Sequence, residues 1–199
     1  MRLVTRPPRW SSQWRRPRAA TAMERLADGM IAASAQNAAA FATQKDTFHK
    51  QLRAYVMIQG HGLALQDRAA NIKLEARTTL LNAGNTPAHS VNFSSRLIIL
   101  PAKVPEDFDF DLPQGDFDAG AMLFPHQTLT YRAWLPDLIS DEELAALKRI
   151  GERTLYVYGV VRYKDIFSEE HYTNFCQFFV WDIAGNYSTV NVLRHNEYT

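Results

Sequence analysis

Cysteine is nearly absent from this sequence of 199 residues, in which Cys176 stands alone. A single cysteine excludes an internal disulfide framework and a multi-cysteine metal site, and it leaves the redox compartment undetermined. The aromatic residues around Cys176 predict a small buried hydrophobic side chain. A reactive thiolate would need a partner base brought close by the fold, and His171, the nearest histidine in the sequence, falls on the opposite face of a regular strand.

Long apolar runs and an excess of basic charge are also missing. No stretch of about 18 apolar residues predicts a transmembrane helix, so we expect a chain that is soluble or peripheral to a membrane. Residues 1–20 contain six Arg and no acid, which leaves 16 basic against 21 acidic residues in the remainder. This mildly acidic body argues against a nucleic-acid partner, because contacts with phosphates need a basic face.

The sequence contains none of the short motifs that mark common catalytic sites. It has no G-x-S-x-G elbow, and GHG at residues 60–62 satisfies neither glycine-rich phosphate-binding pattern. The six histidines occur singly, and His61, His89 and His126 lie in or beside expected turns and should be exposed. We therefore expect no enzyme, no catalytic or metal-binding residues and no cofactor. The alternative is a small enzyme or ligand-binding protein whose site is assembled from distant residues.

Residues 1–22 form a basic segment that we expect to be a disordered tail. Arg, Ser, Pro and two Trp occur here without any Asp or Glu, and Pro7, Pro8 and Pro17 interrupt any long helix. An alternative is an organelle-targeting segment or peripheral contact with a membrane, because Arg and Trp together suit an anionic lipid surface. Met23 would be the initiator if this tail is not a genuine part of the protein.

Residues 23–52 change character and predict one long Ala-rich amphipathic helix. No charge falls between residues 29 and 44, and eight alanines lie between Ala27 and Ala42. An apolar stripe recurs along it at helical spacing. Its members are Leu26, Met30, Ala33, Asn37, Phe41, Phe48 and Leu52, of which the polar Asn37 interrupts the stripe. The expected docking residues are Leu26, Met30, Ala33, Phe41 and Phe48. About 30 residues at 1.5 Å rise make a rod of about 45 Å, longer than a small sheet edge, so we expect part of it to project and to dock on a protein partner or on a second copy.

Residues 53–199 predict an immunoglobulin-like antiparallel β-sandwich of about seven strands, with a barrel as the alternative. Leu155–Tyr163 and Tyr172–Trp181 carry Val, Tyr and Phe on both faces, which indicates a central hairpin covered on two sides. Residues 71–81 alternate apolar and polar side chains with period two. The other expected elements are strands at 53–59, ended by Gly60 and Gly62, at 88–100, 122–135 and 186–193, and one short helix between 136 and 151, capped by Ser140.

The most chemically suggestive segment is the acidic loop EDFDFDLPQGDFD, residues 106–118. Its aspartates are Asp107, Asp109, Asp111, Asp116 and Asp118. Calcium loops also begin with acids at alternate positions, but a loop begun at Asp107 would need Gly where Leu112 stands and Glu where Asp118 stands. We therefore expect an acidic surface loop or sheet edge, with contact to a partner as the first alternative and calcium as the second.

Four segments resemble a group of bacterial proteins with no established function. They are the hairpin sequence YVYGVVRYKDIFSEEHYTNFCQFF, RAYV at 53–56, the NAGNTPA turn and the closing HNEYT. In that group, predicted membrane helices precede an Ala-rich helix, an RAYV-type strand and a β-sandwich. The resemblance covers roughly residues 30–199 and implies the sandwich and attachment to a membrane, but no activity. This sequence departs from the group by lacking the membrane helices.

Together these patterns predict a non-catalytic interaction protein or accessory subunit. Its β-sandwich would be docked through the N-terminal helix to a protein complex, and the resemblance places that complex at a membrane.

Overall fold

The computed structural model describes residues 18–101, 103–112, 120–149 and 151–199, which fall into two compact units, 1–48 and 49–199. The helix α1, Arg18–Leu52, supplies the described part of the first unit. It begins earlier than predicted, so the boundary of the expected tail at residue 22 is wrong. The sequence RAATA that precedes Met23 contains good helix formers, which explains the earlier start. The rest of the expected tail, residues 1–17, lies outside the described residues.

The last turn of α1 belongs to the second unit, and its carbonyl groups are bonded by that unit. The final carbonyls of a helix have no partner within the helix and need one elsewhere. Three side chains supply it: Tyr55 Oη donates to Lys50 O at 3.0 Å, Asn85 Nδ2 donates to Gln51 O at 3.0 Å, and Thr86 Oγ1 donates to Leu52 O. The turn at residues 82–87 therefore caps the helix.

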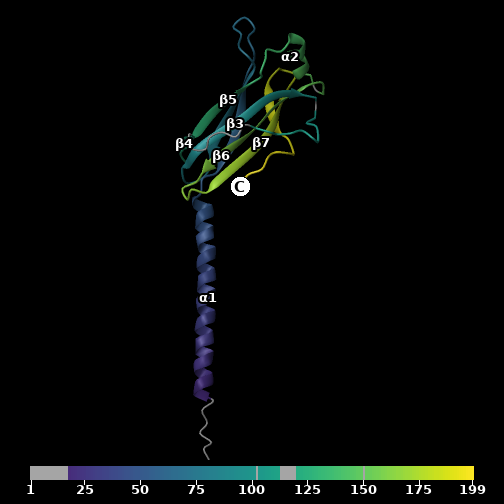
Figure 1. Cartoon of the computed structure of the whole chain (residues 1–199). Helices are drawn as coiled ribbons and strands as arrows, with labels where there is room; N and C mark the ends of the chain where they lie inside the picture. Colours follow the sequence, from purple (N-terminus) through teal and green to yellow (C-terminus); the bar gives the residue numbers. More distant parts are fainter. Residues whose placement is uncertain (1–17, 102, 113–119, 150) are drawn as a thin grey trace, which may run out of the picture. The chain divides into compact units, whose positions relative to one another are not determined.

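The described part of the second unit contains eight strands in two antiparallel sheets (Figure 1). The strands are β1 Val56–Ala64, β2 Glu75–Asn82, β3 Ala88–Leu100, β4 Ala121–Leu123, β5 Thr128–Trp134, β6 Thr154–Lys164, β7 Glu170–Trp181 and β8 Tyr187–Asn191. One sheet has the order β1-β2-β5, and the other has the order β4-β3-β6-β7-β8. The order β1-β2-β5 corresponds to strands A-B-E and the order β3-β6-β7 to strands C-F-G of an immunoglobulin-type sandwich, with β4 and β8 added at the two edges of the second sheet. The predicted fold class is confirmed.

The predicted central hairpin is also confirmed. β6 lies between β3 and β7, and most of its side chains are buried. Gly159 stands where β6 passes close to its neighbours: a Cβ there would lie 2.5 Å from Ser94 O and 2.6 Å from the ring of Phe175. Only glycine fits this close approach.

Three strands differ from the prediction by more than two residues. The strand expected at 71–81 begins only at Glu75, as β2. β1 does not end at Gly60 but continues to Ala64, with a bulge between Ile58 and Gly60. Glycine inside a strand often marks such a bulge rather than the end of the strand. The expected strand 122–135 is split into β4 and β5 by a turn in which His126 has φ +61°, so there are eight strands instead of seven.

The short helix α2, Asp141–Leu147, begins as predicted at Ser140, whose Oγ accepts the backbone N–H of Glu143 at 3.0 Å. Removal of such a cap costs about 1 kcal/mol, so Ser140→Ala should lower the free energy of unfolding in urea by about that amount. Ser188→Ala, at an exposed position of β8, is the matched control and should change stability by less than about 0.5 kcal/mol. Equal effects of the two changes would show that the cap contributes nothing.

Candidate functional site

The predicted docking residues lie on α1, and their side chains are exposed. Leu26 is 67% exposed, Met30 73%, Phe41 71% and Phe48 51%, and Ala33 is exposed as well. Exposed apolar side chains scattered singly are ordinary, but a continuous row of them marks a surface for interaction.

These positions lie on one side of the helix. At about 100° per residue, Leu26, Met30 and Ala33 fall within an arc of about 60°, and Asn37, Phe41 and Phe48 fall within about 60° of Leu26. The opposite side of α1 carries nearly all of its charges between residues 21 and 52: Glu24, Arg25, Asp28, Asp46 and Lys50. The described residues therefore give α1 an apolar face and a charged face.

The acidic loop is a surface loop in its described part. Asp107, Asp109 and Asp111 are exposed, whereas Phe108 and Phe110 turn inward and meet the ring of Tyr158 edge-on at 5.6 and 5.5 Å. The aspartates therefore form its solvated side. The other two predicted residues, Asp116 and Asp118, lie outside the described residues.

A polar hollow of about 350 Å³ lies beside this loop. Two of the predicted acids line it together with residues from β6, β7 and the C-terminal segment: Asp109, Asp111, Arg162, Asn174 and His195. Phe110 stacks on the ring of His195 at 4.4 Å and orients it. Asp109 accepts the backbone N–H of Asp111 at 3.0 Å, so part of its acceptor capacity serves the loop itself.

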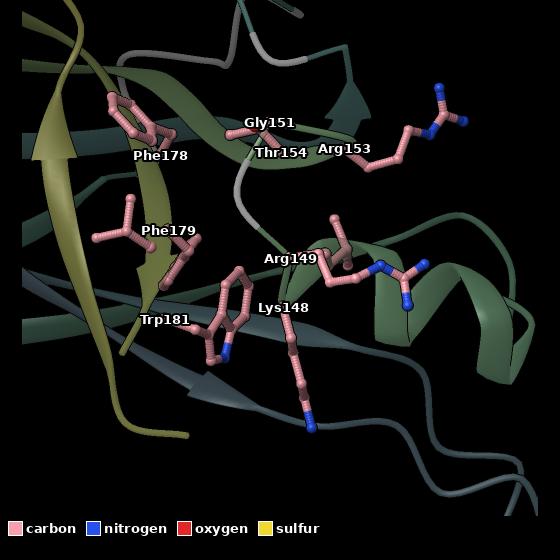
Figure 2. Close-up of a pocket in the computed structure, with 10 residues that line it drawn as sticks. Lys148, Arg149, Gly151, Arg153, Thr154, Phe178, Phe179 and Trp181 are labelled. Atoms are coloured by element: carbon pink, nitrogen blue, oxygen red, sulfur yellow. The ribbon is translucent and has the colours of Figure 1, made fainter. Parts of the chain in front are cut away.

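A second, smaller hollow of about 190 Å³ lies between α2 and the end of β7 (Figure 2). Its aromatic wall consists of Phe178, Phe179 and Trp181. Figure 2 shows the side chains of Arg149 and Arg153 extending away from these rings. Arg149 pairs with Glu152 at 2.9 Å, and Arg153 pairs with Glu143 at 3.2 Å. The two arginines thus do not converge on the aromatic wall, whereas a binding site for a polar substrate would need charged groups that do.

Cys176 is buried, as the sequence predicted, at 1% exposure. It packs on the outer side of β7 with Tyr156 and Tyr158, and burial raises the pKa of its thiol to about 12. A thiol with so high a pKa stays protonated at neutral pH and is a poor nucleophile. His171, the nearest histidine in sequence, is bonded to Asp165 instead.

The prediction that His61 is an exposed turn residue is wrong. It lies in β1 because that strand continues past Gly60, and its ring faces Phe175 at 5.6 Å and Phe179 at 6.2 Å. Its Nδ1 is 2.9 Å from Thr78 Oγ1. Burial lowers the pKa of His61 to about 4, and an opposing interaction with the side chain of Gln177 reduces the shift. The imidazole is therefore neutral at physiological pH.

The turn between β6 and β7 gathers the clearest group of chemically active side chains. Asp165 and His171 are 3% and 6% exposed, and His171 Nε2 lies 2.9 Å from Asp165 Oδ2. Burial alone would raise the pKa of Asp165, but hydrogen bonds from His171 and from the backbone N–H groups of Glu169 and Phe167 hold it below the usual value. Asp165 is thus a buried carboxylate in its charged form.

This group was not predicted, because its members do not follow a regular ligand spacing along the chain. Asp165, Glu169 and His171 come together only when the hairpin closes, and the segment DIFSEEH between two strongly predicted strands was the available signal. The burial of His61 was not predicted for a different reason: glycines flank it on both sides, and such a pair ordinarily indicates the end of a strand.

Comparison with family models, with curated proteins and with solved structures found no match. The class of this protein is therefore defined by its own structure, as an immunoglobulin-like antiparallel sandwich with a long N-terminal helix. None of the helices among the described residues is long and apolar enough to cross a membrane.

Proposed function

We propose that this protein is a non-catalytic interaction protein that associates through the apolar face of α1, with the helix of a second copy as its partner. The observation that carries the proposal is the row of exposed side chains at Leu26, Met30, Phe41 and Phe48 along a helix whose charges lie on the other side. An amphipathic helix of this kind gains stability by burying its apolar face.

The apolar area exposed on α1 is large enough to drive the association of two helices. Full burial of a large apolar side chain contributes about 1.5 to 3 kcal/mol, and four such side chains, each more than half exposed, lie on each helix. Two copies therefore gain on the order of 10 kcal/mol, which lies within the range of about 4 to 15 kcal/mol that association costs. Because the free energy gained by burial and the cost of association are of similar size, we expect a reversible dimer rather than a permanent one.

The spacing of the side chains favours an antiparallel pair. With Asn37 of both copies facing each other, Ala33 of one helix meets Phe41 of the other, and Leu26 meets Phe48, so that a small residue faces a large one near the centre. A parallel pair would instead place Phe41 against Phe41. Two polar residues lie on this face, Asn37 at its centre and Gln44, which would meet Met30 of the other helix. A polar residue within an apolar helix seam commonly fixes its register, which is the role we assign to Asn37.

The sides of this face are compatible with close contact. Gly29, Ala40 and Thr47 border it on one side, and Ala27, Ser34, Ala38 and Lys45 border it on the other. The apolar positions also repeat every eleven residues, as in Met30, Phe41 and Leu52, a period that gives a right-handed supercoil. Apart from Lys45, whose long side chain can extend into solvent, these borders are small and let two helices approach closely.

The test is a pair of double substitutions in the full chain. Met30→Glu with Phe41→Glu should dissociate the dimer and raise its dissociation constant at least a hundredfold, since two charges would be buried in each helix face. Ala32→Glu with Ala39→Glu adds the same charge on the opposite side of α1 and should leave association unchanged. Sedimentation equilibrium between about 5 and 500 µM measures both.

Circular dichroism should show the sandwich folded in both variants. A wild-type chain that stays monomeric over this range would refute self-association. A dimer that survives the first pair of changes would place the contact elsewhere on the molecule.

A further inference from the structure

The turn that closes the β6–β7 hairpin carries more polar side chains than its own closure needs. Asp165 Oδ1 accepts the backbone N–H groups of Phe167 and Glu169 at 2.8 and 3.0 Å, and its Oδ2 is bonded to His171. These bonds fix the turn. The side chain of Glu169 takes no part in them, yet its carboxylate lies beside Asp165 and His171.

One ligand atom from each of Asp165, Glu169 and His171 lies within 4.8 Å of the others. Asp165 and His171 are more than nine-tenths buried, whereas the side chain of Glu169 is 61% exposed. Two carboxylates at this separation repel each other unless a positive charge lies between them. The cluster therefore has a rigid buried side and an adjustable exposed side.

A fourth group approaches from the last turn of α1, which belongs to the same unit. His49 Nδ1 is 4.0 Å from Glu169 Oε1. The ring of His49 lies flat on the ring of Phe167, with centroids 3.9 Å apart and planes 3° apart. Phe167 is part of the same turn, so the stack holds the imidazole beside the carboxylate instead of leaving it to rotate in solvent.

One ring nitrogen of His171 faces the cluster. Its Nε2 lies 2.9 Å from Asp165 Oδ2, whereas its Nδ1, on the other side of the ring, is buried and has no hydrogen-bond partner. The hairpin therefore holds this ring through Nε2 alone, and Nε2 is the atom that a metal ion at the cluster would contact.

We propose that His49, Asp165, Glu169 and His171 form a binding site for one Zn²⁺ ion. Two imidazoles and two carboxylates are ligands that zinc accepts, and together they neutralise its charge. Tetrahedral zinc with bonds of about 2.0 to 2.2 Å places its ligand atoms about 3.3 Å apart. The separation of 2.9 Å between the buried His171 and Asp165 must open slightly, and the 4.0 Å between His49 and the exposed Glu169 must close. Both are small changes of side-chain torsion.

A bound ion would join the last turn of α1 to the β6–β7 hairpin within the second unit. Zinc binding should therefore stabilise this unit by mass action, because a ligand that binds only the folded state raises the unfolding temperature. The proposal does not depend on self-association of α1, because its four ligands come from one chain.

The experiment is a calorimetric titration of Zn²⁺ into the full chain, prepared without an affinity tag and freed of metal with a chelator, at pH 7.5. We expect one equivalent to bind with a dissociation constant of 10 µM or tighter, on the order of 7 kcal/mol of binding free energy, and to raise the unfolding temperature. Co²⁺ as a probe should give visible absorption bands typical of a tetrahedral site.

Two variants and one control decide the result. Glu169→Gln and His49→Gln leave the buried Asp165–His171 pair intact, so the fold should persist while zinc affinity falls at least tenfold, as lost ligands do. Glu170→Gln removes the neighbouring carboxylate, which pairs with Lys164 at 3.9 Å, and should bind zinc as the wild type does. The proposal is overturned if no saturable equivalent binds below 1 mM, or if Glu169→Gln binds as tightly as the wild type. In either case the cluster only closes the hairpin.

Discussion

Phe175→Ala should lower the free energy of unfolding of the full chain by about 3 to 5 kcal/mol, the cost of removing a buried aromatic ring and leaving a cavity. Phe175 is 2% exposed and lies where the two sheets meet, with the ring of Phe93 at 5.8 Å and that of His61 at 5.6 Å. Gly159 stands against it on β6, so the surrounding backbone cannot easily move inward. Urea denaturation followed by fluorescence measures the loss.

Phe124→Ala is the matched control for this substitution. Phe124 is 48% exposed in the turn between β4 and β5, so its replacement should cost less than about 1 kcal/mol. If Phe175→Ala also costs less than about 1 kcal/mol, the inner face of β7 is not the centre of the core. The half-buried Phe178, on the other face of β7, should give an intermediate loss.

Acidification from pH 7 to pH 4 should destabilise the protein by about 3 kcal/mol through His61 alone. Burial lowers the pKa of His61 to about 4 in the folded state, against 6.5 in an ordinary setting. The unfolded chain therefore binds the proton more strongly, and its contribution to stability is present above pH 6.5 and is lost as the pH falls toward 4. Thr78, Phe175, Gln177 and Phe179 surround the ring, and none carries a charge that could stabilise the imidazolium.

His61→Gln removes the titrating group. The free energy of unfolding of the wild type should therefore fall relative to that of the variant as the pH falls from 7 to 4. His126→Asn serves as the control, because His126 is exposed and Asn tolerates its positive φ. Unfolding free energies at half-unit steps of pH give both profiles. Parallel profiles for wild type and His61→Gln would show that His61 titrates normally and is open to solvent.

The sequence was sufficient to predict a secondary-structure element where one physical effect dominated. Val, Tyr and Phe on both faces of residues 155–181 leave few alternatives to a central hairpin. Ser140 followed by three acids similarly marks the start of α2, because the hydroxyl, the charges and the exposed N–H groups act together. Local chemistry determined these elements, and the structure agrees with the prediction.

The sequence was insufficient to predict the extent of a strand or the members of a site where these depended on contacts across the fold. Gly60 and Gly62 would end an isolated strand, but β1 continues past them after a bulge, because its pairing with β2 extends to Ala64. The same pairing brings His61 between the sheets. The ligands of the proposed zinc site come from a turn and from the end of a helix, and no spacing rule along the chain connects His49 with residues 165–171.

Disulfide cross-linking of variants with one introduced cysteine tests the association of α1 most directly. The native Cys176 is 1% exposed and should not react. Under mild oxidation we predict that Asn37→Cys forms a covalent dimer, that Ala33→Cys does so only when mixed with Phe41→Cys, and that Ala32→Cys, on the charged side of the helix, does not. Ala33→Cys dimers without the second variant would show a parallel pair. Equal cross-linking at Ala32 and Asn37, or none at Asn37, would contradict the claim that the apolar face of α1 binds a second copy.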